Sequence, residues 1–313
     1  MVTTDQADLV VERTDPQDFR RYRVGDGWQP MEVAREQVYV RGREPVAIEL
    51  CFTRHGPVIH EDRARHRAYV LRWVGAEPGT AAYLASLAVD RAENWSQFRA
   101  AAARWKTPAL NLTYADVDGN IGWIAAGLTP LRAGYNGLLP VPGANDKYRW
   151  QGFLDMEQYP QMLNPPEQFI VTSNHNILPP GYAHEISYEW VAPYRHLRLR
   201  EMLHEKSRFA PDDFQRMQYD NVSIPVRNLV ALLNRVGVVD PEMAPYFRLV
   251  SEFDGRMDRS SAAAAICGCW VPKLAEAYYG AKAPRHLVPR LFDRVGQKAM
   301  FDCLDTPTEA WFG

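Results

Sequence analysis

The stretch NLTYADVDGNIGWIAAG, residues 111–127, decides the class of fold, because it holds two β-rich runs separated by turn residues. Branched and aromatic side chains on both sides of the centre favour strands. At the centre stands Asp118-Gly119, a dipeptide that accepts the positive φ values of a tight hairpin turn. The stretch therefore predicts a β-hairpin, and with it an antiparallel sheet.

The chain before this hairpin has the same strand-like character up to about residue 75. Its short β-rich runs are separated by Gly, Pro and charged residues, and they read DLVVER, QVYVRG, PVAIELCFTR, GPVIHE and RAYVLRW. A single helix is expected next, since Trp95, Phe98, Ala102 and Trp105 are spaced by three, four and three residues, with Asn94 as the N-cap.

The chain after Trp190 carries helical periodicity instead. The runs concerned are RHLRLREMLHEKS, PDDFQRMQYDNVSIPVRNLVALLNRV and SSAAAAICGCWVPKLAEAYYG. Strands followed by helices indicate an α+β fold rather than alternating β-α-β units. We expect a single domain over 1–313, mainly strands with one helix and irregular loops in 1–200, and mainly helices in 201–313.

Composition excludes several classes of function. The 313 residues are 46% hydrophobic and 24% charged, which is typical of a globular protein. A net charge of −2 gives no reason to bind nucleic acid. The longest apolar run, residues 263–273, is shorter than the roughly 20 residues of a membrane-spanning helix, so no membrane association is expected. The four cysteines are expected to be buried thiols.

A second stretch, FIVTSNHNILPP at 169–180, raises a question of function. It predicts an apolar strand that ends in Ser173, Asn174, His175 and Asn176 before two prolines. Ser and Asn followed by Pro are typical of a turn. The alternative is an oxyanion site, in which a rigidly held amide donates to a developing negative charge.

Common catalytic motifs are missing from the sequence. There is no Gly-x-Ser-x-Gly nucleophile elbow and no Gly-rich phosphate-binding loop. His184-Glu185 and His204-Glu205 begin like a zinc-protease helix, but the second histidine is absent, so both are expected to be surface charges.

Several stretches, in this order, resemble the penicillin acylase (penicillin amidase) family of N-terminal nucleophile hydrolases. They are DLVVER, TRHGPVI, LRW, YADVDGNIGW, LPVPG, Trp150-Gln-Gly152, NPPEQFIVTSNHN and QYDNVS, and they cover nearly the whole chain. The resemblance implies part of a four-layer αββα sandwich with antiparallel sheets. It also implies that the substrate is a small N-acyl amide, which makes the chain a segment of an amide hydrolase.

The resemblance assigns two catalytic residues. Asn174 matches the family's oxyanion asparagine, whose side-chain amide contributes roughly 3 to 4 kcal/mol to transition-state stabilisation. Arg195 matches an arginine that supports the active centre, and its alternative is a helix-start arginine in a surface ion pair. A further family pattern, Gln218, Asp220 and Ser223, implies a structural role in capping and joining helices.

A structural calcium ion is the third implication of the resemblance. Asp5 and Asp8 match the family's paired aspartates, and Glu185 is in register with a later acidic ligand that is an aspartate in the family. With backbone carbonyls such as that near Gly137, these carboxylates would suit the 6 to 8 oxygens that calcium prefers. The alternative is an ordinary charged turn.

The family's nucleophile has no counterpart here, since the expected Gly-Ser-Asn-x-Trp junction does not occur. By register Met1 lies downstream of that serine, near the position of the family's second oxyanion donor. Thr3 is a poor substitute, because its nitrogen stays in a peptide bond. We therefore expect an inactive internal segment whose partners are the missing segments of the same precursor.

Two other functions stay open from the sequence. One is a non-catalytic remnant or interaction domain, and the other is a binding protein for small acids that uses Arg195 and Asn174. The location stays unknown: the chain shows no signal peptide, whereas family members are commonly periplasmic or secreted.

Overall fold

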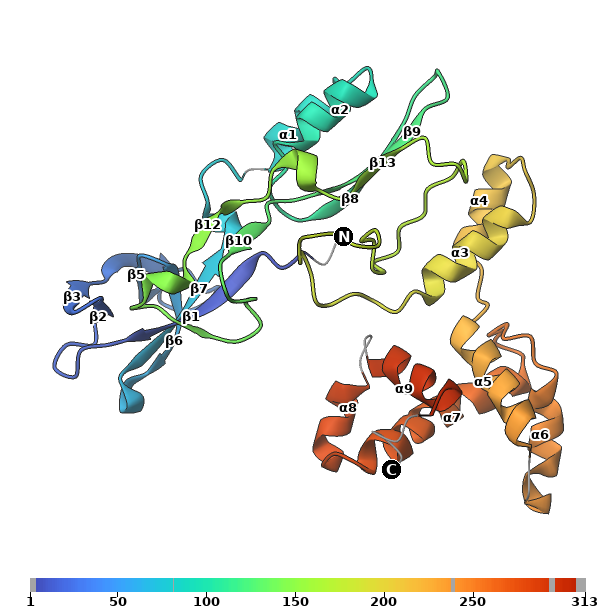
Figure 1. Ribbon diagram of the computed structural model, residues 1–313. Helices are drawn as coiled ribbons and strands as arrows, with labels where there is room; N and C mark the ends of the chain where they lie inside the picture. Colours follow the sequence, from blue (N-terminus) through green and yellow to red (C-terminus); the bar gives the residue numbers. More distant parts are fainter. Residues whose placement is uncertain (1–3, 81, 238–239, 293–295, 308–313) are drawn as a thin grey trace. The chain divides into compact units, whose positions relative to one another are not determined.

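The computed structural model describes residues 4–80, 82–237, 240–292 and 296–307 (Figure 1). The expectations about Met1 and Thr3 lie outside these residues. The chain divides into two compact units. Unit 1 comprises the chain up to Ile170 together with Leu178–Tyr188, and unit 2 comprises Val171–Ile177 together with the chain from Glu189 onward. The single domain predicted from the sequence stays a prediction.

Unit 1 is built on a six-stranded sheet in the order β11-β1-β7-β6-β5-β4. Its strands are β1 (Ala7–Arg13), β4 (Glu32–Val38), β5 (Val46–Thr53), β6 (Gly56–Asp62), β7 (Arg67–Trp73) and β11 (Val141–Pro142). Neighbouring strands are antiparallel, as predicted, except that β1 and the short β11 run parallel. The predicted strand QVYVRG is wrong in its position, because β4 ends at Val38 and the exposed Tyr39 follows it.

Strand β1 places two carboxylates on the buried face of this sheet. Its side chains alternate between partly exposed and buried, and the buried ones are Asp8, Val10 and Glu12. Val10 packs with Val70 and Val141 in an apolar cluster. Two carboxylates on the same buried face require cations or hydrogen-bond donors beside them, because an unpaired buried charge is very costly.

The hairpin that the sequence predicts is present. Strands β8 (Leu110–Ala115) and β9 (Ile121–Ala126) pair antiparallel, and β13 (Gln161–Leu163) extends them to a three-stranded sheet. The turn, however, has five residues, because the Asp116 carboxylate accepts hydrogen bonds from the backbone N–H groups of Asp118 and Asn120. Positive φ is confined to Gly119 within this turn.

The predicted helix is α2 (Trp95–Ala102), and the Asn94 side chain caps it by accepting from the Gln97 N–H. It ends at Ala102, before Trp105. Phe98 packs against Tyr114 of the three-stranded sheet, with ring centroids 5.2 Å apart. A second helix, α1 (Ala82–Val89), also precedes the hairpin, so the prediction of a single helix there is wrong. The remaining strands of unit 1 are short: β2 (Arg21–Val24), β3 (Gly27–Pro30), β10 (Pro130–Arg132) and β12 (Trp150–Phe153).

Unit 2 is helical, as the periodicity predicts. Its helices are α3 (Tyr194–His204), α4 (Pro211–Gln218), α5 (Ile224–Val236), α6 (Ala244–Ser251), α7 (Ala262–Gly280), α8 (Val288–Leu291) and α9 (Gly296–Asp305). Its main core joins Leu229 of α5, Tyr278 and Tyr279 of α7 and Met300 of α9. None of the described helices has the length and apolar character that a membrane crossing requires.

Antiparallel sheets followed by a helical C-terminal third confirm the predicted α+β class. Another predicted strand is absent, because Phe169–Thr172 belong to no strand. The apolar side chains there suggest a strand, but strand assignment depends on a neighbouring strand, which no sequence pattern supplies.

Candidate functional site

Asn174 and Arg195, which the resemblance singles out, meet in unit 2. Arg195 is the second residue of α3, and its Nη2 donates to the Asn174 side-chain oxygen Oδ1 at 2.9 Å. The same nitrogen donates to the Ser173 carbonyl oxygen, also at 2.9 Å. A guanidinium group can only donate hydrogen bonds. The contact therefore fixes which side of the amide carries the oxygen, and directs the Asn174 NH₂ group away from Arg195.

The backbone of Asn174 is held as well as its side chain. Its carbonyl oxygen accepts a hydrogen bond from the Val191 N–H at 2.9 Å. Its φ is 64°, a left-handed conformation that asparagine tolerates better than most residues. Asn174 is thus a half-buried amide whose NH₂ direction is set by side-chain and backbone contacts together, which is the property that an oxyanion donor needs.

A cavity of about 570 Å³ lies in unit 2 beside this pair, and Ser173 and Arg195 line it. Arg198 and Asp220 form a two-pronged ion pair at the cavity, with nitrogen–oxygen distances of 2.8 and 2.9 Å. The hydrogen bonds from Arg198 lower the pKa of Asp220. Because Arg198 belongs to α3 and Asp220 precedes α5, the pair joins two helical segments, as the family pattern implies.

Ser223 and Gln218 complete that pattern. The Ser223 hydroxyl accepts from the Val226 N–H and caps α5, which confirms the predicted capping role. Gln218, the last residue of α4, lines the cavity.

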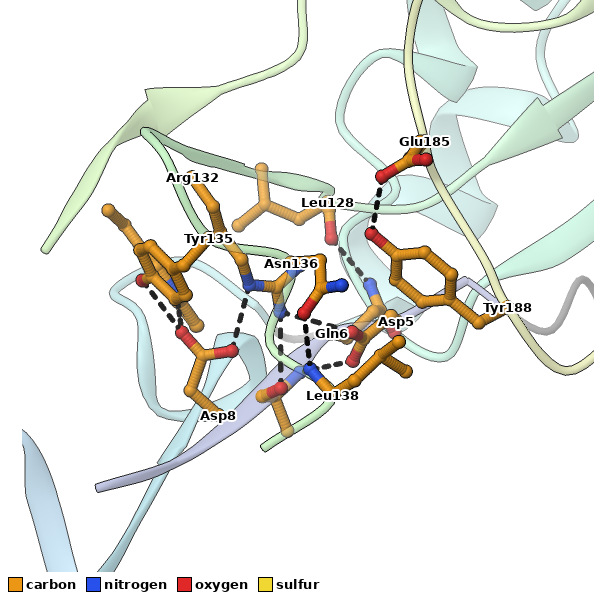
Figure 2. A network of polar contacts seen from close by, with 12 residues as sticks. Asp5, Gln6, Asp8, Leu128, Arg132, Tyr135, Asn136, Leu138, Glu185 and Tyr188 are labelled. Carbon is orange, nitrogen blue, oxygen red and sulfur yellow. Dashed lines mark hydrogen bonds and ion pairs between the residues drawn. The ribbon is translucent and has the colours of Figure 1, made fainter. Parts of the chain in front are cut away.

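The predicted calcium ligands Asp5 and Asp8 lie in unit 1, where Arg132 stands between them (Figure 2). Arg132 Nε donates to Asp8 Oδ1 at 2.8 Å, and Nη2 lies 3.4 Å from Asp5 Oδ2. Nη2 also donates to the Ala7 carbonyl oxygen at 3.1 Å. One guanidinium group therefore contacts both aspartates and donates to a backbone oxygen beside them.

The second oxygen of Asp8 is occupied too. Asp8 Oδ2 accepts from the Trp150 indole N–H at 2.6 Å and from the Tyr135 hydroxyl at 3.0 Å. Burial and the nearby Asp8 charge raise the pKa of Tyr135, so this hydroxyl stays protonated and donates. Asp8 is only 3% exposed, and its charge is satisfied by groups of the protein itself.

Glu185 is not part of this group. Its carboxylate accepts a hydrogen bond from the Tyr188 hydroxyl at 2.7 Å, on the other side of Asp5 in Figure 2. Burial, followed by this bond, raises the pKa of Tyr188 to about 12. Within the described ranges, no three His, Cys, Asp or Glu side chains are placed to hold one metal ion.

The arrangement of Asp5, Asp8 and Glu185 consequently does not fit a calcium ion, because Arg132 places a positive charge between the two aspartates and contacts one oxygen of each. Gly137 does approach Asp8, since a side-chain carbon on this glycine would lie 2.7 Å from Asp8 Oδ1. Calcium at these residues stays a prediction from the family resemblance. The role of Arg132 escaped sequence reasoning because it lies 124 residues from Asp8.

Comparison with known proteins agrees with the motifs. The family model described as penicillin amidase matches residues 1–312. Acyl-homoserine lactone acylase QuiP of Pseudomonas aeruginosa is 28% identical over 89% of the chain, and penicillin acylase 2 proenzyme of Pseudomonas sp. (strain SE83) is 31% identical over 83%. These matches cover 36% and 34% of the two relatives. The chain thus spans about a third of their length.

A solved structure agrees in fold. Penicillin G acylase from Alcaligenes faecalis superposes with a TM-score of 0.85 at 20% identity, over 99% of this chain and 61% of that chain. The similarity supports the predicted fold class. A family model that matches essentially the whole chain, together with relatives of the same family, shows that the chain belongs to the penicillin amidase family.

Proposed function

We propose that the chain supplies the oxyanion-stabilising part of an amide hydrolase that acts on small N-acyl amides. The observation that carries the proposal is the bond from Arg195 Nη2 to Asn174 Oδ1, which directs the Asn174 NH₂ group away from the arginine. In an attack on an amide carbonyl, that NH₂ group donates to the oxygen as its negative charge develops. Arg195 orients the amide and adds positive charge nearby.

The substrate class follows from what the relatives have in common. They are named acyl-homoserine lactone acylase, penicillin acylase 2 proenzyme and penicillin G acylase, and all three names denote removal of an acyl group. The bond cleaved in this proposal is therefore the amide between a carboxylic acid and an amine.

The nucleophile in this proposal comes from an N-terminal residue that does not belong to the chain printed here. A free α-amino group has a pKa of about 7.7 to 8.0, so it can act as the general base for its own side chain near neutral pH. The partners are thus other segments of an acylase, which bring the nucleophile to the Asn174 amide. The name proenzyme for one relative is consistent with such processing.

A chimeric enzyme tests the proposal. Residues 4–307 replace the matched stretch of the acylase QuiP, and hydrolysis of an N-acyl-homoserine lactone is followed by release of the amine. The matched control receives the equivalent stretch of penicillin acylase 2 proenzyme. Turnover in both chimeras supports the proposal. A folded chimera without turnover, beside an active control, would contradict it.

A further inference from the structure

Two histidines stack directly beside the candidate site. The rings of His175 and His196 have centroids 3.7 Å apart and planes inclined by 20°. His175 follows Asn174 in the chain, and His196 follows Arg195. The Arg195–Asn174 hydrogen bond and the histidine stack are thus two consecutive cross-links between segment 171–177 and the first turn of α3.

The stack accounts for a conformation that Asn174 does not favour by itself. A left-handed φ of 64° is less favourable than extended backbone for a residue with a side chain. The hydrogen bond from the long Arg195 side chain holds the amide, but a flexible side chain restrains the backbone weakly. The two stacked rings restrain the backbone of both segments more strongly, because a histidine side chain has only two rotatable torsions.

We infer that His175 and His196 are positioning residues that hold the Asn174 amide in its donating direction, and that they do so only while His175 is neutral. The inference rests on the proposed function for its meaning in catalysis. Its physical content, a histidine stack that locks one loop, stands independently of any reaction.

The surroundings of His175 disfavour its protonation. Its Nδ1 is buried without a hydrogen-bond partner within the described residues, so a proton there would have no acceptor. The charged or titratable groups that act on it are His196 in the stack and Arg200, one turn further along α3. Burial first, and then His196 and Arg200, lower the pKa of His175 to about 4.

The direction of the pH effect follows from this shift. A histidine released from the stack has a pKa near 6.5, so the open loop binds more protons than the closed loop between about pH 6.5 and 4. The closed geometry is fully favoured above this range and is lost as the pH falls through it. Since His175 is only partly buried, we expect opening to increase about tenfold between pH 7 and pH 5.

Hydrogen exchange of one backbone amide measures this opening in the purified chain. The Val191 N–H is bonded to the Asn174 carbonyl oxygen, so its protection factor reports on closure of the loop. The Arg227 N–H, bonded to the Ser223 carbonyl oxygen at the start of α5, is the internal control. We expect Val191 protection to fall about tenfold from pH 7 to pH 5, with Arg227 protection unchanged.

Three variants decide the cause. His175→Phe keeps a flat ring but cannot titrate, so Val191 protection should be equal at both pH values. His175→Tyr, whose ring does not titrate between pH 5 and 7, is the second choice if that variant does not fold. His175→Ala removes the stack and should lower protection at both values. His204→Phe changes an exposed histidine of the same helix and should behave as wild type.

The inference is overturned if Val191 protection in the wild type does not depend on pH, if His175→Phe keeps the pH dependence, or if His175→Ala keeps full protection. None of these readings uses catalysis. If the chimera is inactive but Val191 protection depends on pH as expected, the proposed function alone is rejected. If the chimera is active but Val191 protection does not depend on pH, the role of the stack alone is rejected.

Discussion

Arg195 and Asn174 are joined through a single nitrogen, because Arg195 Nη2 donates both to the Asn174 side-chain oxygen and to the Ser173 carbonyl oxygen, each at 2.9 Å. The arginine thus ties the orientation of the amide to the backbone that carries it. The position of the amide and its direction cannot change independently while this nitrogen holds both oxygens.

Replacing Arg195 by Met should lower turnover of the chimera by about a hundredfold, because a misdirected amide loses its alignment with the developing oxyanion. Arg195 is largely exposed, so the fold should survive. Arg208→Met, at an exposed arginine in the loop after α3, is the matched control. Equal kcat values for the two variants would remove Arg195 from the active centre.

Arg132→Met should lower the free energy of unfolding by about 3 kcal/mol, since it leaves the buried Asp8 carboxylate without its cation. Arg35→Met removes an exposed ion pair with Glu49 and should cost less than about 1 kcal/mol. Urea denaturation followed by tryptophan fluorescence measures both.

Calcium and its removal by EDTA should leave the urea midpoint of the wild type unchanged, because Arg132 already lies between Asp5 and Asp8 and contacts one oxygen of each. A midpoint that rises with calcium would instead support the metal site that the family resemblance implies. Asp8→Asn would then have to abolish the rise.

Gly143→Ala should destabilise the chain by about 1 to 3 kcal/mol. A side-chain carbon at this position would lie 2.2 Å from Oε2 of Glu12, which is completely buried and bonded through its other oxygen to His55 Nδ1 at 2.8 Å. Gly268 lies in the middle of α7, where a side-chain carbon would meet no other atom within 4 Å. Gly268→Ala should therefore stabilise the chain by about 0.5 to 1 kcal/mol. Chemical denaturation of the two variants compares these effects, and a loss of the same size at both glycines would contradict the account.

Asp220→Asn should lower the free energy of unfolding by about 2 kcal/mol at pH 7, because it weakens the two-pronged pair with Arg198. Arg198 lowers the pKa of Asp220, so the pair stabilises the fold above the unfolded pKa of about 3.9. This stabilisation is lost as the pH falls through the lower folded pKa. The difference between wild type and variant should therefore shrink below about pH 4, and a constant difference down to pH 2 would reject the explanation.

Sequence reasoning succeeded where the determinants are local. The β8–β9 hairpin and α2 with its Asn94 cap depend on residues within a few positions of each other. It failed where partners are remote: the cation between Asp5 and Asp8 comes from Arg132, and the partner of the His175 ring is His196 on α3. The expected strand at Phe169–Thr172 failed for the same reason, because strand pairing is a long-range property.

The candidate site combines residues that sequence motifs identify with a contact that they do not reveal. Asn174 and Arg195 were found through the order of family motifs, and the structure adds that they are hydrogen-bonded. A polar loop after an apolar run suggests a turn as readily as an oxyanion site. The direction of the amide is set by a residue 21 positions away, so composition and periodicity could not have revealed it.

The most direct test of the central claim is the turnover of Asn174→Asp in the chimera, compared with Asn176→Asp two residues along the same loop. Aspartate has the shape of asparagine and retains an oxygen for Arg195, but when ionised it cannot donate a hydrogen bond. The account predicts that kcat falls by about a hundredfold or more for Asn174→Asp and stays near the parent value for Asn176→Asp. Turnover of Asn174→Asp equal to that of the parent would contradict the assignment of Asn174 as the oxyanion donor.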